Sequence, residues 1–319
     1  MAYLFWIVLL AIAAAAATWV WIDFLRWKRT TLARLHEGAQ LIETSKGPIE
    51  CAVSGEGPAI LLSHGALGGY DQGLAAIASG FFGDGPHRFI AVSRPGYLRT
   101  PPEVGKTPEE QADAFAALLD ALKIQKAILL AISGGGPPSL QFALRHSDRC
   151  AALLLVSAVT ERIPRPKLGM LGLFLRVVTH TDFVAWITLG LARRYPRLFF
   201  RSLLSSGELG RIRDPGVAAT GLRLMDSTMP FSARRAGLMI DANFITELRA
   251  YPLASIRVPT LLVHGTNDKI VPFASSEHTA AAIPGARLVP VPNGSHFACL
   301  LAPGEFRAEV AGFLEKLVK

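Results

Sequence analysis

Cysteine is scarce in this chain of 319 residues, and the cysteines that it has lie far apart. Cys51, Cys150 and Cys299 are odd in number and form no C-x-x-C pair. That pattern argues against a disulfide framework and against a cysteine-based metal or redox site. No segment repeats at a fixed period, which argues against a repeat architecture. We expect no metal and no other cofactor.

The chain also has few acidic residues relative to basic ones, so its formal net charge is +8. No basic run is interleaved with aromatic residues in the manner of a nucleic-acid-binding module. We therefore expect no nucleic-acid partner. The positive charge favours an anionic membrane surface instead.

Two glycine motifs that bind phosphate groups are incomplete. Gly134 and Gly136 could begin G-x-G-x-x-G, but the sixth position is Ser139, so the dinucleotide-binding pattern is not met. A Gly-Lys-Thr triplet at 105–107 resembles the end of a phosphate loop, yet its required first glycine is replaced by Thr100. The sequence thus excludes the two commonest nucleotide-binding loops.

Charge is absent from residues 2–22, a long hydrophobic run. About 20 apolar residues cross the roughly 30 Å of bilayer hydrocarbon, so this run predicts a transmembrane helix that contacts membrane lipid. Trp19 and Trp21 lie where an interfacial aromatic belt belongs. Basic residues from Arg26 to Arg34 follow, which by the positive-inside rule places the remaining chain in the cytoplasm. A cleaved signal peptide is the alternative, although no Lys or Arg precedes the run.

Short apolar runs recur along the rest of the chain, with helical patterns between most of them. Uninterrupted runs of this length are typical of strands that are buried on both faces, and their alternation with helices predicts a mostly parallel α/β sheet flanked by helices. The expected strands are 41–44, 49–53, 59–63, 88–92, 127–132, 151–157, 260–263 and 287–291. The clearest expected helix is 107–122, where Thr107 caps and Pro108 takes the first position.

The alternation breaks between Thr160 and Leu253, where only helical patterns occur, such as 168–178 and 182–191. We interpret this interval as a helical cap inserted between two strands. The expected organisation is a membrane anchor at 1–24, the first part of the core at 25–160, the cap at 161–252 and the second part of the core at 253–319.

Ser133 follows a predicted strand directly and precedes a predicted helix, with glycines next to it. Strand, sharp turn and helix are the context of a nucleophile elbow, whose consensus is G-x-S-x-G. Ala131 replaces the first glycine of that consensus, and a residue of this size is still small enough for the helix and the strand to approach each other. Ser133 is the predicted nucleophile.

A serine nucleophile needs a base and a group that orients the base. His296 lies in a glycine turn after the last predicted strand, and Asp268 lies in the loop after the strand before it. Both positions are at carboxyl ends of parallel strands, where sites in α/β sheets form. We predict a triad of Ser133, Asp268 and His296, with Glu161 as the alternative acid. The backbone N–H groups of Ala66 and Gly134 are the predicted oxyanion hole.

From about residue 41 to its end, the chain resembles the α/β-hydrolase family. Five motifs occur in the order that the family shows: His64-Gly65 with Gly68-Gly69, Arg94-Pro95-Gly96-Tyr97, the Ser133 elbow, His264-Gly265 with Asp268, and Gly294-Ser295-His296. The resemblance implies a Ser-His-Asp hydrolase with a cap over its site. It does not cover the N-terminal run.

The function expected from these residues is hydrolysis of a carboxylic ester of an apolar small molecule through an acyl-enzyme. Two other reactions on the same triad stay open, namely carbon–carbon bond hydrolysis and removal of an N-terminal residue from a peptide. A non-catalytic, membrane-tethered binding module is the alternative of another class. The complete triad argues against this last alternative.

Overall fold

The computed structural model describes residues 1–83, 85–164, 181–201, 204–211, 213–301, 304 and 306–318. Its centre is an eight-stranded sheet in the order β1-β2-β4-β3-β5-β6-β7-β8. The β2 strand runs antiparallel to both of its neighbours, and the strands from β4 to β8 are parallel. The mostly parallel sheet predicted from the sequence is therefore confirmed. The strands are β1 Gln40–Thr44, β2 Gly47–Ser54, β3 Ala59–Ser63, β4 Arg88–Val92, β5 Ala127–Ile132, β6 Cys150–Val156, β7 Thr260–Gly265 and β8 Arg287–Val291.

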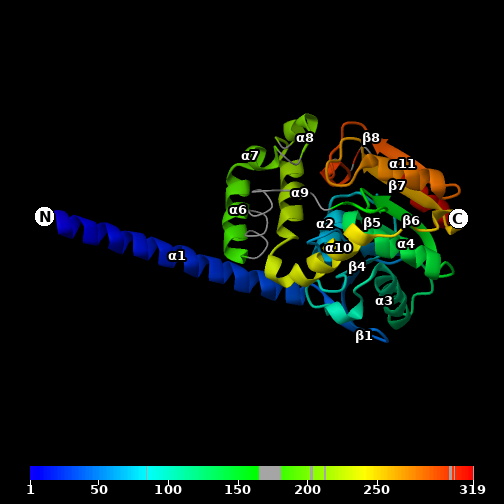
Figure 1. The fold of residues 1–319 in the computed structure, drawn as a ribbon, viewed down its shortest axis with the longest axis horizontal. Helices are drawn as coiled ribbons and strands as arrows, with labels where there is room; N and C mark the ends of the chain where they lie inside the picture. Colours follow the sequence, from blue (N-terminus) through cyan, green and yellow to red (C-terminus); the bar gives the residue numbers. More distant parts are fainter. Residues whose placement is uncertain are drawn as a thin grey trace.

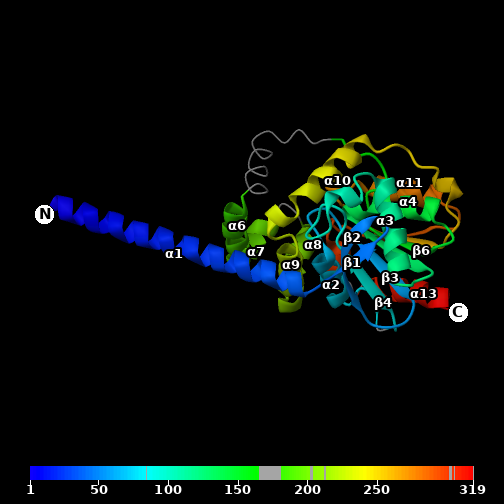
Figure 2. The same cartoon turned by 90° about the horizontal axis from the view of Figure 1, so that it is seen from below.

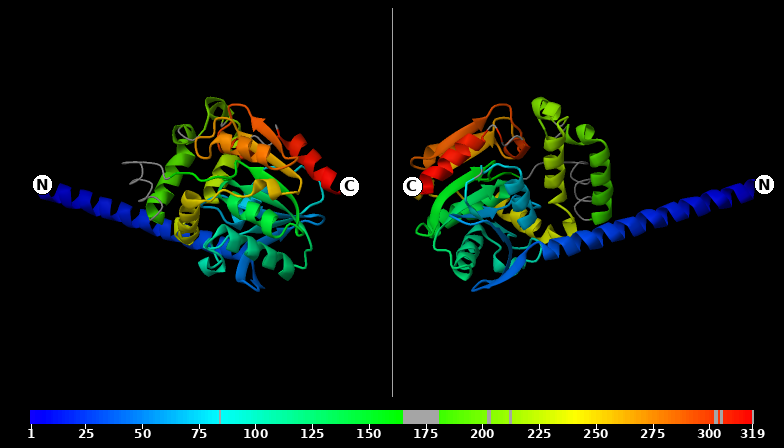
Figure 3. Two further views of the ribbon diagram at one scale, coloured as in Figure 1. Left: turned by 45° about the vertical axis from the view of Figure 1, so that its right-hand side comes forward. Right: turned by 180° about the vertical axis from the view of Figure 1, so that it is seen from behind.

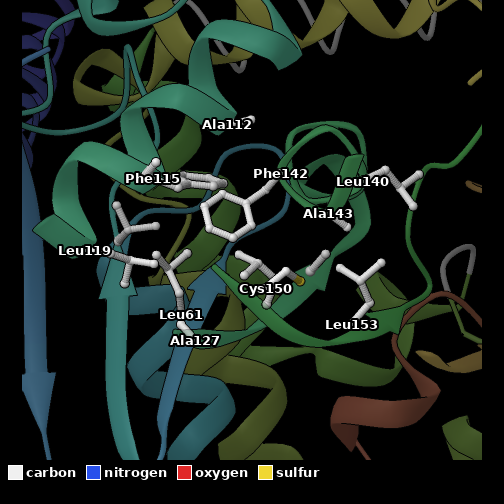
Figure 4. Packing of buried hydrophobic residues seen from close by; sticks show 14 of the residues in the cluster. Leu61, Ala112, Phe115, Leu119, Ala127, Leu140, Phe142, Ala143, Cys150 and Leu153 are labelled. Atoms are coloured by element: carbon white, nitrogen blue, oxygen red, sulfur yellow. The ribbon is translucent and has the colours of Figure 1, made fainter. Parts of the chain in front are cut away.

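Helices cover both faces of the sheet, which is why its central strands are apolar throughout. The α3, α4 and α11 helices pack on one face, and α2 and α13 pack on the other. Figure 4 shows the first of these cores, where Phe115 of α3 and Phe142 of α4 lie over Leu61, Ala127 and Leu153 of the strands. The bounds are α2 Tyr70–Ala78, α3 Pro108–Ala121, α4 Gly136–Arg145, α11 Phe273–Ala282, α12 Ala298–Leu301 and α13 Arg307–Val318.

The α3 helix shows how closely local sequence sets an element. Thr107 accepts a hydrogen bond from the backbone of Glu110, and the Glu110 side chain bonds back to the Thr107 backbone. This reciprocal pair is a capping box, and it satisfies two backbone donors that a helix start otherwise leaves free. The predicted and observed starts of this helix agree for that reason.

Between β6 and β7 the described residues form only helices. They are α6 Asp182–Arg194, α7 Pro196–Phe200, α8 Ser206–Arg211, α9 Pro215–Asp226 and α10 Arg235–Glu247, with a short 3-10 turn, η3 Phe231–Ala233, before α10. The predicted helix at 168–178 lies outside the described residues. The α6 and α9 helices stand side by side at the end of the molecule from which the N-terminus projects (Figures 1 and 3).

The N-terminal run belongs to α1, a single helix that spans Ala2–Glu37. Its first part extends away from the body, and its last turns lie against the body beside α6 and α9 (Figures 1 and 2). The segment Tyr3–Glu37 is long and apolar enough to cross a membrane. Phe24 and Leu35 are buried in contacts with the body, so the helix continues through the predicted boundary at residue 24.

Candidate active site

Ser133 occupies a sharp turn between β5 and α4. Its φ of +48° is in the left-handed region, which costs a residue with a Cβ of order 1–3 kcal/mol and occurs mainly where function requires it. The turn is tight because glycines let other strands approach it: a Cβ on Gly135 would collide with the Ser63 carbonyl, and one on Gly136 with the Val159 carbonyl. The Val159 N–H also donates to the Ser133 carbonyl at 2.8 Å. These contacts explain why the elbow needs small residues.

His296 and Asp268 meet at the carboxyl ends of β7 and β8. His296 Nδ1 lies 2.7 Å from Asp268 Oδ2, and the His296 side chain is 8% exposed. Because the carboxylate only accepts hydrogen bonds, Nδ1 carries the proton and donates it. In the neutral ring Nε2 is then unprotonated, as a general base must be.

Asp268 is fixed by more contacts than the sequence indicated. Its Oδ1 accepts from the N–H groups of Ile270 and Val271 at 2.8 and 3.0 Å. His264 Nε2 lies 3.0 Å from Asp268 Oδ2, and His264 Nδ1 lies 2.6 Å from the Ser276 hydroxyl. Burial alone would raise the pKa of Asp268, but hydrogen bonds from His264 and His296 hold this pKa well below its usual value. The acid is therefore ionised and can orient His296.

Glu161, the alternative acid, lies elsewhere. Its carboxylate pairs with His278 on α11, whose side chain is 67% exposed. The geometry therefore favours Asp268 over Glu161. Cys299 lies in α12 and is buried in the core, and burial raises the pKa of its thiol to about 12, so it is not an available nucleophile.

Ser133 and His296 open into one cavity of about 360 Å³ between the sheet edge and the cap. Most of its lining side chains are apolar. They include Leu189 of α6, Phe200 of α7, Leu224 of α9 and Phe231 of η3. Among the described residues that line the cavity, none is Lys, Arg, Asp or Glu. Such a space accommodates an uncharged, apolar group.

The two predicted oxyanion donors are neighbours. A Cβ on Gly134 would lie 3.3 Å from Ala66 N, and Ala66 lines the cavity together with Ser133. Among the residues that the structure describes, none accepts a hydrogen bond from the Ala66 N–H. Gln72 holds the loop by accepting from the adjacent Gly65 N–H at 2.7 Å. The Ala66 N–H therefore lies in a loop that Gln72 holds in place beside the cavity.

A buried ion pair joins the cap to this loop, and the sequence did not reveal it. Arg94 donates both Nη atoms to Asp241 of α10, at 2.7 and 2.6 Å, and both side chains are at most 1% exposed. Arg94 Nε also donates to the His64 carbonyl at 3.0 Å. Tyr97 donates its hydroxyl to Asp241 at 2.6 Å, and burial raises the pKa of that phenol well above its usual value.

A second pair lies beside the first. Arg234, just before α10, is fully buried and donates to Asp71 at 3.0 and 2.7 Å and to the Gly68 carbonyl at 2.6 Å. Glu208 of α8 makes a third link, because it accepts from the backbone and hydroxyl of Ser295 at 3.1 and 3.0 Å, next to His296. The cap thus contacts the loops on both sides of the triad.

The aromatic residues of the cap divide between two tasks. Phe200 lines the catalytic cavity, whereas Phe183 and Trp186 pack on Phe24 of α1, with ring centroids 5.2 and 5.8 Å apart. Spacing along the sequence could not show this, because the partner of these rings lies about 160 residues away in α1.

No group of three or more potential metal ligands occurs within the described residues.

Comparisons with known proteins identify the family to which the chain is similar. The sequence profile of the alpha/beta hydrolase fold family matches residues 58–303. The uncharacterized hydrolase YcgS of Bacillus subtilis is 28% identical over 283 residues, which cover 84% of this chain and 95% of that one. The 2-hydroxymuconate semialdehyde hydrolase of Pseudomonas putida is 28% identical over 82% of this chain and 88% of its own length.

A solved structure extends the likeness to three dimensions. An alpha/beta hydrolase fold protein from Nakamurella multipartita superposes with a TM-score of 0.71 at 32% identity, and the match covers 86% of this chain and 98% of that chain. The fold and the relatives define this protein as a hydrolase. The chain belongs to the α/β-hydrolase family.

Proposed function

We propose that the protein is a serine hydrolase that cleaves carboxylic esters of an apolar substrate through an acyl-enzyme. The observation that carries this proposal is the cavity at Ser133 and His296, whose walls are apolar and bear no charged side chain among its described lining residues. An ester presents an uncharged carbonyl to such a site. A substrate with a free carboxylate or ammonium group would be buried there without an opposite charge, at a cost of several kcal/mol.

The residues divide the reaction between them. His296 Nε2 takes the proton of the Ser133 hydroxyl as its Oγ attacks the carbonyl carbon, and the N–H groups of Ala66 and Gly134 donate to the oxyanion. The ester C–O bond then breaks, and His296 returns the proton to the departing alcohol. Water attacks the acyl-enzyme with His296 again as base, which releases the acid and restores Ser133. Asp268 holds the His296 Nδ1–H throughout.

Two alternatives use the same triad. Removal of an N-terminal residue requires recognition of an ammonium group, for which the described cavity wall offers no carboxylate. Carbon–carbon bond hydrolysis is supported by the name of the relative from Pseudomonas putida. It remains the second candidate, and its products separate it from ester hydrolysis.

We further propose that α1 spans the bilayer and that the catalytic domain lies in the cytoplasm. The support is the length and hydropathy of Tyr3–Glu37, together with the basic residues that follow its apolar part. Protease added to intact cells should then leave the catalytic domain whole and cleave it only after lysis. Cleavage in intact cells, or a mature N-terminus after residue 17, would overturn this placement.

A series of p-nitrophenyl esters tests the reaction. The full chain in detergent should hydrolyse medium or long acyl esters with a higher kcat/KM than acetate, because each buried methylene adds about 0.8 kcal/mol of binding. Ser133→Ala should be inactive. Leu189→Trp, which fills part of the cavity, should shift the preference to shorter chains. No hydrolysis of any ester, with turnover of a carbon–carbon substrate instead, would contradict the proposal.

A further inference from the structure

The α6 helix has two apolar faces that look in opposite directions. Its inner face contributes Ala185, Thr188 and Leu189 to the catalytic cavity. Its outer face carries Ile187 and Leu191, which are 40% and 56% exposed. The exposed residues continue past the end of α6 with Tyr195 and Leu198, which are 53% and 73% exposed. We name Ile187, Leu191, Tyr195 and Leu198 the outer cap stripe.

Single exposed apolar side chains are common, but four large ones within positions 187–198 make this segment a candidate interaction site. The spacing of Ile187 and Leu191 places them on one side of the helix, one turn apart. Figure 1 shows α6 and α7 at the end of the body that faces the projecting part of α1. No other described element lies beyond them on that side in Figures 1 and 3.

The position of α1 sets the level of a bilayer relative to this stripe. Its side chains from Tyr3 to Trp19 are exposed, a length of about 26 Å at the helical rise, which is close to the hydrocarbon thickness. The helix meets the cap immediately afterwards. Trp21 packs on Phe183 of α6 with ring centroids 5.3 Å apart. The beginning of α6 therefore lies where the span reaches the bilayer surface.

An ion pair fixes this arrangement. Lys28 of α1 lies 2.7 Å from Asp182, the first residue of α6, and Asp182 also accepts from the backbone and hydroxyl of Ser232. Burial alone would raise the pKa of Asp182, but the bonds from Lys28 and Ser232 lower it. Figure 1 shows that α6 runs across the direction of α1, so this helix lies along the surface of a bilayer that α1 crosses.

Charge beside the stripe has the sign that an anionic lipid surface attracts. Arg194, Arg197 and Arg201 are exposed on and around α6 and α7. The whole interval 160–252 holds 14 Lys or Arg residues against 7 Asp or Glu residues. Each basic side chain near an anionic leaflet contributes about 1 kcal/mol of attraction, and apolar side chains between such residues insert at the headgroup level.

We propose that the outer cap stripe rests in the surface of an anionic bilayer, so that α6 is the wall between the membrane and the catalytic cavity. A membrane-dissolved apolar ester then reaches Ser133 past the edge of α6 without crossing bulk water. The docking itself rests on the proposed span of α1. The route of the substrate rests on the proposed ester hydrolysis.

Fluorescence quenching tests the docking separately from the reaction. The full chain is reconstituted in phosphatidylcholine vesicles with and without phosphatidylserine, and a nitrobenzoxadiazole label is placed at Leu191→Cys or Leu198→Cys. The three native cysteines are buried and do not compete for the label. Leu41→Cys on β1 is the control, because Leu41 is similarly exposed at 42% and lies away from the cap (Figure 1).

Lipids with a nitroxide near the headgroup should quench the labels at positions 191 and 198 strongly, more so with phosphatidylserine present, and the label at position 41 hardly at all. Equal quenching at all three positions would overturn the proposal. This readout does not depend on hydrolysis, so it stands even if no ester proves to be a substrate.

The route of the substrate has its own test. The double variant Leu191→Glu, Leu198→Glu should lower the hydrolysis of a long-chain ester carried in vesicles by about tenfold or more, since it removes apolar insertion and adds repulsion. Hydrolysis of a water-soluble short ester should stay unchanged, and Leu41→Glu should affect neither. An equal loss on both esters, or no loss on the vesicle ester, would contradict the route.

Discussion

The sheet edge and the cap meet at one cavity, but they are held there in different ways. The sheet edge carries Ser133, Asp268 and His296 on short loops that directly follow β5, β7 and β8. The cap is joined to that edge by buried ion pairs between residues far apart in the chain, of which Arg94 with Asp241 is the most deeply buried.

The sheet edge and the cap therefore contribute to different properties of the proposed enzyme, namely the catalytic reaction and the choice of substrate. Loop geometry at the strand ends fixes the nucleophile and its base, whatever lies above them. The cap supplies eleven of the 22 described residues that line the cavity, so we expect it to influence which substrate is accepted. Water cannot take the place of a lost partner in these buried ion pairs, so we expect the loss of one pair to weaken the docking of the whole cap.

The largest expected effect is on the sheet edge. Asp268→Asn should lower kcat by about 10⁴-fold, because an amide cannot hold His296 in the required tautomer. Glu161→Gln is the matched control and should change kcat little, since Glu161 pairs with His278 instead. Steady-state kinetics on one ester measure both. A severe loss in the control together with a mild loss in Asp268→Asn would move the acid to residue 161.

A substitution in the ion pair that holds the cap should change the free energy of unfolding more than the catalytic rate. Asp241→Asn leaves Arg94 buried without its carboxylate and should lower the free energy of unfolding by about 3–5 kcal/mol. Asp113→Asn removes the partially exposed partner of Arg145 and should cost less than about 1 kcal/mol. Urea titrations followed by tryptophan fluorescence compare the two. Equal costs would show that the buried pair does not hold the cap.

A smaller effect should follow from crowding the oxyanion hole. Ala66→Val displaces the backbone N–H from the position of the oxyanion and should lower kcat by about 10²-fold, with a smaller change in KM, because the charge forms only in the transition state. Measuring kcat and KM separately distinguishes the two. If only KM rises, Ala66 contacts the substrate but its N–H does not stabilise the oxyanion.

The smallest effect concerns pH. The folded pKa of Asp268 is depressed, so the carboxylate adds stability that is fully present above the unfolded pKa of about 4 and is lost as pH falls toward the folded value. The stability advantage of the wild type over Asp268→Asn should therefore be constant near neutral pH and shrink below about pH 4. If the stability difference between the wild type and Asp268→Asn instead grew as the pH fell, the depressed pKa of Asp268 would be contradicted.

Much of the sheet edge could be predicted from the sequence, because its signals are local. The strand runs, the cap of α3 at Thr107 and the small residues around Ser133 each depend on neighbours within a few positions. The positions of Ser133, Asp268 and His296 after β5, β7 and β8 followed from the predicted strands together with the motifs beside them. The structure brings Asp268 and His296 into contact and Ser133 into the same cavity.

The contacts between the cap and the sheet edge could not be predicted. Arg94 and Asp241 are 147 positions apart, and no local pattern pairs them. The contact of His264 with Asp268 could not be predicted for another reason, because a histidine that precedes a glycine also fits a purely structural role. The packing of α1 on the body also joins residues far apart in the chain. Phe24 is buried against Phe183, so a truncation beginning near Thr30 would remove this contact.

The central claim is that Ser133 is a nucleophile activated by His296, and a fluorophosphonate probe tests it most directly. Attack by the Ser133 Oγ forms an O–P bond and expels fluoride, so the mass of the intact chain should rise by one probe, located on the peptide that contains Ser133. Ser133→Ala should take up none, and His296→Ala should react far more slowly. Full labelling of folded Ser133→Ala, or no labelling of the folded wild type, would contradict the account.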